Sequence, residues 1–141
     1  MCRSAILRRV GEENVERSYA AYDAFNRRDW PSALAIHAAD VEVTPLAAAV
    51  GSSYQGADGL RRYWNDLLTN FPDFTTEVLE VRDLGELTLC AVRFRGHGAG
   101  SAAPFEQVVW QLAQWSDGGI AWWRSYVSEA EALSAAEEIS A

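Results

Sequence analysis

Apolar residues in the first half of the chain recur every three or four positions, which is the spacing of one face of an α-helix. The pattern predicts a helix from Glu12 to Arg28 and another from Ala57 to Phe71. A short helix is predicted for residues 29–37, because aspartate caps helix N-termini and proline fits a first turn. Residues 1–11 lack such a stripe, and we expect them to form a flexible extension.

In the second half the period changes to two, which is the spacing of one face of a β-strand. The alternation predicts strands at residues 79–81, 87–94, 105–115 and 120–127. The breaks between them are rich in glycine and aspartate and suit hairpin loops. Three weaker patterns predict a brief edge strand at 41–44, a loop or weak hairpin at 46–56, and a terminal helix from Ser128.

Helices followed by consecutive antiparallel strands are typical of an α+β domain with the helices on one face of a curved sheet. The chain has 141 residues, 49% of them apolar, which is enough for one hydrophobic core and outside the composition of disordered proteins. We therefore expect a single domain over residues 12–141.

Charge, the length of apolar runs and cysteine content limit the partners and the location that we expect for the protein. A net charge of −8 repels phosphate backbones, so nucleic acid is not an expected partner. No apolar run approaches the ~18 residues of a membrane span. Cys2 and Cys90 are too few for a disulfide framework, and two histidines suggest no metal cluster. A reducing cytoplasm is the expected location, with no membrane, metal or cofactor.

Several segments carry a more specific signal: YDAFNRRDW at 22–30, DVEV at 40–43, YQG at 54–56 before LRRYW at 60–64, and DGGI at 117–120 before WRSY at 123–126. With these segments the chain resembles the SnoaL-like branch of the nuclear-transport-factor-2-like, ketosteroid-isomerase-like cone fold from Glu12 to Leu133. The resemblance implies an α+β cone, in which three N-terminal helices and a curved, mainly antiparallel sheet enclose a cavity. It also implies, in many members, a homodimer through the sheet.

The sequence departs from the catalytic branches of this fold. By resemblance, the base, tyrosine and protonated acid of ketosteroid isomerases correspond to Thr44, Ala21 or Tyr22, and Gln111. The Trp-Arg-Asp-Tyr run of limonene epoxide hydrolases has Ser125 in place of its aspartate. We therefore expect neither activity, and whether the protein is an enzyme stays open.

Strand alternation, placed on the cone fold, assigns an inner face that is mostly apolar with neutral polar groups. The predicted ligand-binding residues are Tyr22, Thr44, Trp64, Val92, Phe94, Gln107, Val109, Gln111, Trp123 and Ser125. The aromatic residues either line a site for a flat ligand or pack as core. The two glutamines either orient a ligand or bond each other, water or a helix hydroxyl, because an unpaired buried amide costs about 1–3 kcal/mol.

These residues predict a protein that binds a mainly apolar or aromatic small molecule. One alternative is a cyclase- or isomerase-type enzyme with Glu42 as general base, although a glutamate at that position is commonly solvated. Another is a non-catalytic protein–protein adaptor. On the outer face, Trp110, Trp122 and Tyr126 predict a homodimer interface, unless a terminal segment covers them.

Overall fold

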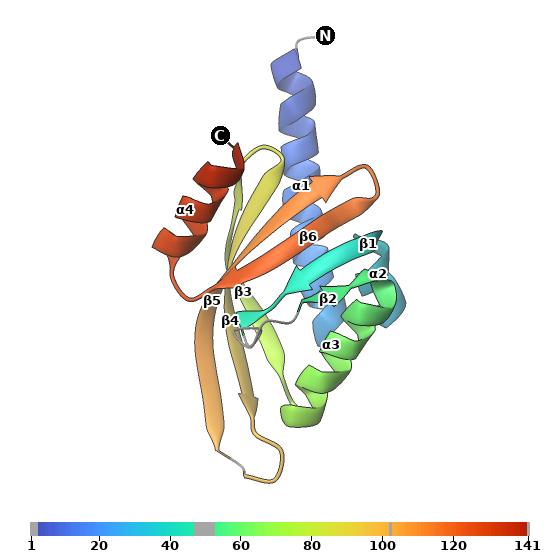
Figure 1. Cartoon of the computed structure of the whole chain (residues 1–141), viewed down its shortest axis with the longest axis vertical. Helices are drawn as coiled ribbons and strands as arrows, with labels where there is room; N and C mark the ends of the chain where they lie inside the picture. Colours follow the sequence, from blue (N-terminus) through green and yellow to red (C-terminus); the bar gives the residue numbers. More distant parts are fainter. Residues whose placement is uncertain (1–2, 47–52, 102, 141) are drawn as a thin grey trace.

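The computed structural model describes residues 3–46, 53–101 and 103–140, which form four helices and one six-stranded sheet (Figure 1). The helices are α1 (Arg3–Asn26), α2 (Trp30–Ala35), α3 (Gly56–Asn70) and α4 (Glu129–Ser140). The strands are β1 (His37–Thr44), β2 (Tyr54–Gln55), β3 (Thr75–Asp83), β4 (Leu87–His97), β5 (Pro104–Ser116) and β6 (Gly119–Tyr126). Their order is β2-β1-β6-β5-β4-β3, and the α+β cone is confirmed.

Three local predictions need correction. Helix α1 begins at Arg3 rather than Glu12, because the arginine, alanine and leucine that precede Glu12 favour a helix without an apolar stripe. That residues 1–11 behave as a flexible extension stays a prediction. Residue 37 belongs to β1, since α2 ends at Ala35. Strand β1 is not an edge strand, because it lies between β2 and β6 and pairs in parallel with β6.

The predicted hairpin at 46–56 is visible in part. Gln55 and Tyr54 pair antiparallel with Glu42 and Val43, while residues 47–52 lie outside the described part of the chain. Side chains cap two helix N-termini. The Asp29 side chain accepts a hydrogen bond from the Ser32 amide, which confirms the predicted cap, and Ser128 Oγ accepts one from the Glu131 amide.

The concave face of the sheet packs against α1, α2 and α3. Its buried core residues include Phe25, Val41, Val43, Leu60, Trp64, Phe74, Trp115 and Ile120. Aromatic contacts connect the helices, and the rings of Trp30 and Trp64 stack with their centroids 5.0 Å apart. This core fixes the helices that form the roof of the cavity.

The opposite face of the sheet is covered by α4, which lies across the sheet from α3 in Figure 1. Ala132 and Ala136 of this helix are buried against Leu112, which is completely buried. Trp110, Trp122 and Tyr126 pack against the same cluster and are half-buried. The predicted aromatic patch is therefore covered in part by the chain itself, because the terminal helix supplies the small residues that fit over it.

The free edge of the sheet is protected where it borders the helices. The Asn26 side chain, at the end of α1, donates to the Thr76 carbonyl at 2.8 Å and accepts from the Thr76 amide at 2.9 Å. The side-chain amide of Asn26 thus makes the two hydrogen bonds that a neighbouring strand would make to this residue of β3. It also fixes the position of Thr76, whose side chain faces the cavity.

Candidate ligand cavity

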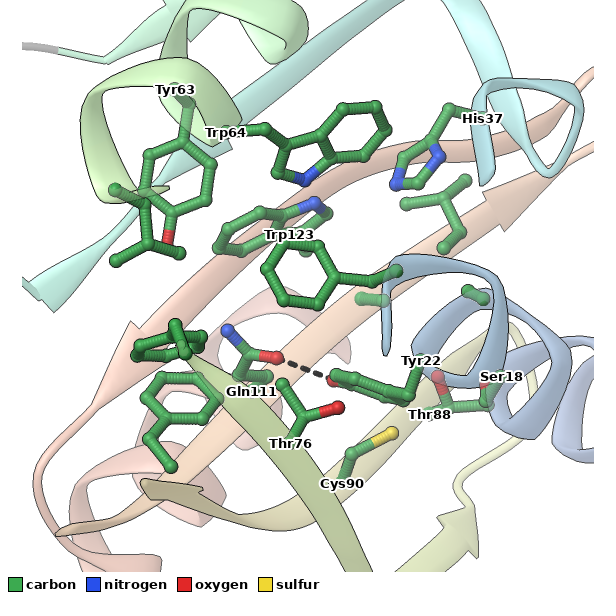
Figure 2. A pocket seen from close by; sticks show the side chains of 17 residues that line it. Ser18, Tyr22, His37, Tyr63, Trp64, Thr76, Thr88, Cys90, Gln111 and Trp123 are labelled. Carbon is green, nitrogen blue, oxygen red and sulfur yellow. Dashed lines mark hydrogen bonds between the residues drawn. The ribbon is translucent and has the colours of Figure 1, made fainter. Parts of the chain in front are cut away.

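A cavity of about 80 Å³, partly open to solvent, lies between the helices and the concave face of the sheet (Figure 2). It is several times the ~10–15 Å³ that one water molecule requires. The cavity is lined by Ser18, Ala21, Tyr22, Phe25, His37, Tyr63, Trp64, Leu67, Phe74, Thr76, Thr88, Cys90, Phe94, Gln111, Ala113, Ile120 and Trp123. No described lining residue carries a carboxylate, a lysine or an arginine.

A hydrogen-bonded row of neutral groups crosses the floor of the cavity. The Tyr22 hydroxyl, on α1, donates to Oε1 of Gln111, on β5. Nε2 of Gln111 donates to Oγ of Ser125, on β6, at 3.0 Å. Figure 2 shows Tyr22 and Gln111 pointing toward each other across the cavity. Burial raises the pKa of Tyr22 well above its usual value, so the hydroxyl remains a donor at neutral pH.

A second polar cluster lies beside Tyr22. Cys90 of β4 has the hydroxyls of Ser18 and Thr88 near its thiol, and Thr88 accepts a hydrogen bond from the Trp115 indole at 3.0 Å. Burial raises the pKa of the Cys90 thiol to about 11, although these hydroxyls favour the thiolate. The thiol is therefore protonated at neutral pH and unreactive as a nucleophile.

His37 lies where α2 passes into β1. Its Nδ1 is 2.8 Å from the Ala33 carbonyl oxygen, which can only accept, so Nδ1 carries the proton. Burial, with a smaller contribution from the nearby Arg17, lowers the pKa of His37 to about 4, although the hydrogen bond to the Ala33 carbonyl favours the charged form. At neutral pH the imidazole is uncharged.

Aromatic rings form the roof and one wall. Tyr63 of α3 and Trp123 of β6 meet edge to face, with centroids 5.6 Å apart, and Trp64 lies beside His37. Burial raises the pKa of Tyr63, which keeps its hydroxyl neutral. The lining as a whole suits a flat, uncharged ligand with a few hydrogen-bonding groups, because nothing in it compensates the desolvation of a charge.

A family model described as a SnoaL-like domain matches residues 16–123. The chain belongs to the SnoaL-like family. No curated protein matches the chain.

Solved structures share the fold of this SnoaL-like protein. An NTF2-like protein of unknown function from Burkholderia pseudomallei superposes with a TM-score of 0.73 at 20% identity, covering 86% of this chain and 95% of its own. IdmH, a putative polyketide cyclase from Streptomyces antibioticus, gives 0.71 at 20% identity, with coverages of 88% and 98%. TerC, co-crystallised with polyporic acid, gives 0.72 at 16% identity, with coverages of 88% and 98%.

Several residues that the sequence predicts as ligand-binding lie together in the cavity. The lining includes Tyr22, Trp64, Phe94, Gln111 and Trp123, and Ser125 adjoins it through its bond to Gln111. Val92 and Val109 are completely buried but do not line the cavity. That these residues bind a ligand remains a proposal.

Three predicted residues lie elsewhere. Gln107 is exposed near the tip of the β4–β5 hairpin, which extends beyond α3 in Figure 1, so no helix covers it. Glu42 and Thr44 alternate with the buried Val41 and Val43 and therefore point to the opposite face. Glu42 accepts a hydrogen bond from the Gln55 side chain at 3.1 Å.

The structure also adds residues that the strand pattern missed. Alternation along the last strand places Ile120 on the same outer face as Trp122, but an irregular register between Gln114 and Trp115 turns Ile120 inward. Thr88 shares the alternation of Cys90, so its inward direction was available from the sequence. His37 contacts the Ala33 carbonyl at the end of α2, and its place in the cavity follows from the position of β1.

The described residues contain no group of three or more His, Cys, Asp or Glu side chains that could hold a metal ion. None of their helices is both long and apolar enough to cross a membrane.

Proposed function

We propose that this SnoaL-like protein binds an uncharged, mainly apolar aromatic or polycyclic molecule in its cavity and that Gln111 orients it. The observation that carries the proposal is an amide, in a mainly apolar and aromatic cavity, that uses only half of its hydrogen-bonding groups within the protein. Gln111 is 7% exposed and lies among Tyr22, Phe94 and Trp123. Burying such an amide is costly unless its groups find partners.

The hydrogen bonds of Gln111 leave capacity for a ligand. A glutamine amide has two N–H donors and an oxygen with two lone pairs. One N–H goes to Ser125 and one lone pair to the Tyr22 hydroxyl, which leaves one of each. These two partners also hold the amide in one orientation. A ligand carbonyl that accepts the second N–H would complete the donors of the amide.

The comparisons support a ligand of this kind. TerC was crystallised with polyporic acid, and IdmH is described as a putative polyketide cyclase. The cyclase alternative for the present chain relied on Glu42, which lies on the other face of the sheet. A binding role without that residue is therefore the proposal we retain, in a reducing cytoplasm that is compatible with the free Cys90 thiol.

Replacing Gln111 by leucine should weaken binding of α-tetralone, a two-ring ketone, by about 1–3 kcal/mol, because the carbonyl loses its donor. Quenching of tryptophan fluorescence measures this affinity, since Trp64 and Trp123 line the cavity. The matched control is Gln107→Leu, which makes the same change on the same strand outside the cavity. Equal affinities of the wild type and Gln111→Leu, or equal losses in both variants, would contradict the proposal.

We also propose a homodimer through the part of the outer face that α4 leaves open. There Glu77, Arg93, Arg95 and Glu106 form ion pairs across β3, β4 and β5. Sedimentation at micromolar concentration should show a species of twice the 15.6 kDa chain mass. A single species of one chain mass would refute this assembly.

A further inference from the structure

We propose that His37 is a second ligand-orienting residue, which accepts a hydrogen bond from a hydroxyl group of the bound molecule. The preferred ligand would then be an aromatic ketone with a carbonyl at one end and a hydroxyl at the other. This inference rests on the proposed function, because it concerns the same cavity.

The backbone determines which nitrogen of His37 can accept. The Ala33 carbonyl, in the last turn of α2, takes the proton on Nδ1. A neutral imidazole has one donor nitrogen and one acceptor nitrogen, so Nε2 holds the lone pair. The short α2 helix therefore determines the tautomer and the direction of the ring.

Nε2 has space beside it. No hydrogen bond to Nε2 of His37 is found in the described part of the chain. Among the same residues, the side-chain atom that is both fully enclosed and without a hydrogen-bond partner is Nδ2 of Asn14, so Nε2 of His37 is not fully enclosed. Nε2 is therefore unpartnered but accessible. Figure 2 shows the His37 ring beside Trp64, on the opposite side of the cavity from Gln111.

The surroundings of His37 favour a neutral donor. Trp64 meets the ring edge to face at 6.2 Å, and Ile120 lines the cavity on the neighbouring strand. Because the imidazole is uncharged at neutral pH, it acts there as an acceptor. An acceptor among apolar groups costs free energy unless a donor meets it, and a ligand hydroxyl supplies one.

The two ends of the cavity thus differ in polarity. Gln111 offers an N–H to a carbonyl, while His37 offers a lone pair to an O–H. The aromatic wall between them includes Trp123 and Phe25. A ligand with both groups would satisfy both ends at once, whereas one with two carbonyls would place an acceptor against an acceptor.

Three probes test this assignment: α-tetralone, its derivative with a hydroxyl group para to the carbonyl, and the methyl ether of that derivative. The wild type should bind the hydroxyl probe about five- to tenfold more tightly than the ether, which cannot donate. His37→Asn keeps an N–H for the Ala33 carbonyl but has no atom at the Nε2 position. This variant should bind the hydroxyl probe and the ether equally.

The outcomes separate the two proposals. If the wild type binds none of the probes, the proposed function fails, and the role of His37 fails with it. If it binds all three equally, the role of His37 alone is overturned, whether or not the variant folds. Equal losses for all three probes in His37→Asn would show a structural role and also overturn the assignment. Gln111→Leu should weaken all three and keep the preference for the hydroxyl.

Discussion

Replacing Trp64 by alanine is expected to lower the free energy of unfolding by about 3–5 kcal/mol. The indole is 7% exposed and stacks on Trp30 at 5.0 Å. Its ring centroid also lies 6.4 Å from that of Phe25 and 6.2 Å from that of His37. Through these contacts and the stack on Trp30, Trp64 joins α3 to α1, β1 and α2. Because rings on three elements would lose a partner, neighbouring side chains cannot fill the space that alanine leaves.

Urea unfolding followed by far-ultraviolet circular dichroism measures this loss independently of tryptophan emission. Trp64→Phe should cost less, since phenylalanine keeps an aromatic contact with Trp30. Tyr19→Ala, at a position 48% exposed, is the surface control and should change stability by no more than about 0.5 kcal/mol. A loss below about 1 kcal/mol for Trp64→Ala would mean that the ring does not connect these elements as described.

Acidification is expected to destabilise the protein through His37. Its pKa is about 4 when folded, against 6.5 in the unfolded chain. Above pH 6.5 the imidazole is neutral in both states and contributes no pH dependence. As the pH falls from 6.5 to 4, the unfolded chain binds a proton that the folded protein excludes. The free energy of unfolding therefore falls, by about 3 kcal/mol over the whole interval.

Unfolding measured between pH 7 and pH 4.5 tests this slope. His37→Asn, which does not titrate, should show a smaller slope, and the difference between the two proteins isolates His37 from other groups. Three carboxylates with lowered pKa values act mainly below this range: Asp29, hydrogen-bonded to Ser32, Asp73, hydrogen-bonded to His97, and Glu106, hydrogen-bonded to Arg95. Equal slopes in the wild type and the variant would show that His37 is not shielded from protonation.

The periodicity of the sequence determined the elements and much of the cavity. Helical spacing located α1 and α3, and alternation located β4, β5 and β6. The same alternation placed Gln111 inside and its neighbour Trp110 outside, as the structure shows. These predictions succeed because the direction of a side chain along one regular element depends on its neighbours in the chain.

Tertiary structure decided the rest, through contacts between residues distant in the sequence. The parallel pairing of β1 with β6 carries His37 into the cavity. An irregular register turns Ile120 inward, the end of α3 leaves Gln107 exposed, and α4 covers Trp122. None of these follows from local periodicity, because strand partners, register and coverage are chosen by the packing of the whole core.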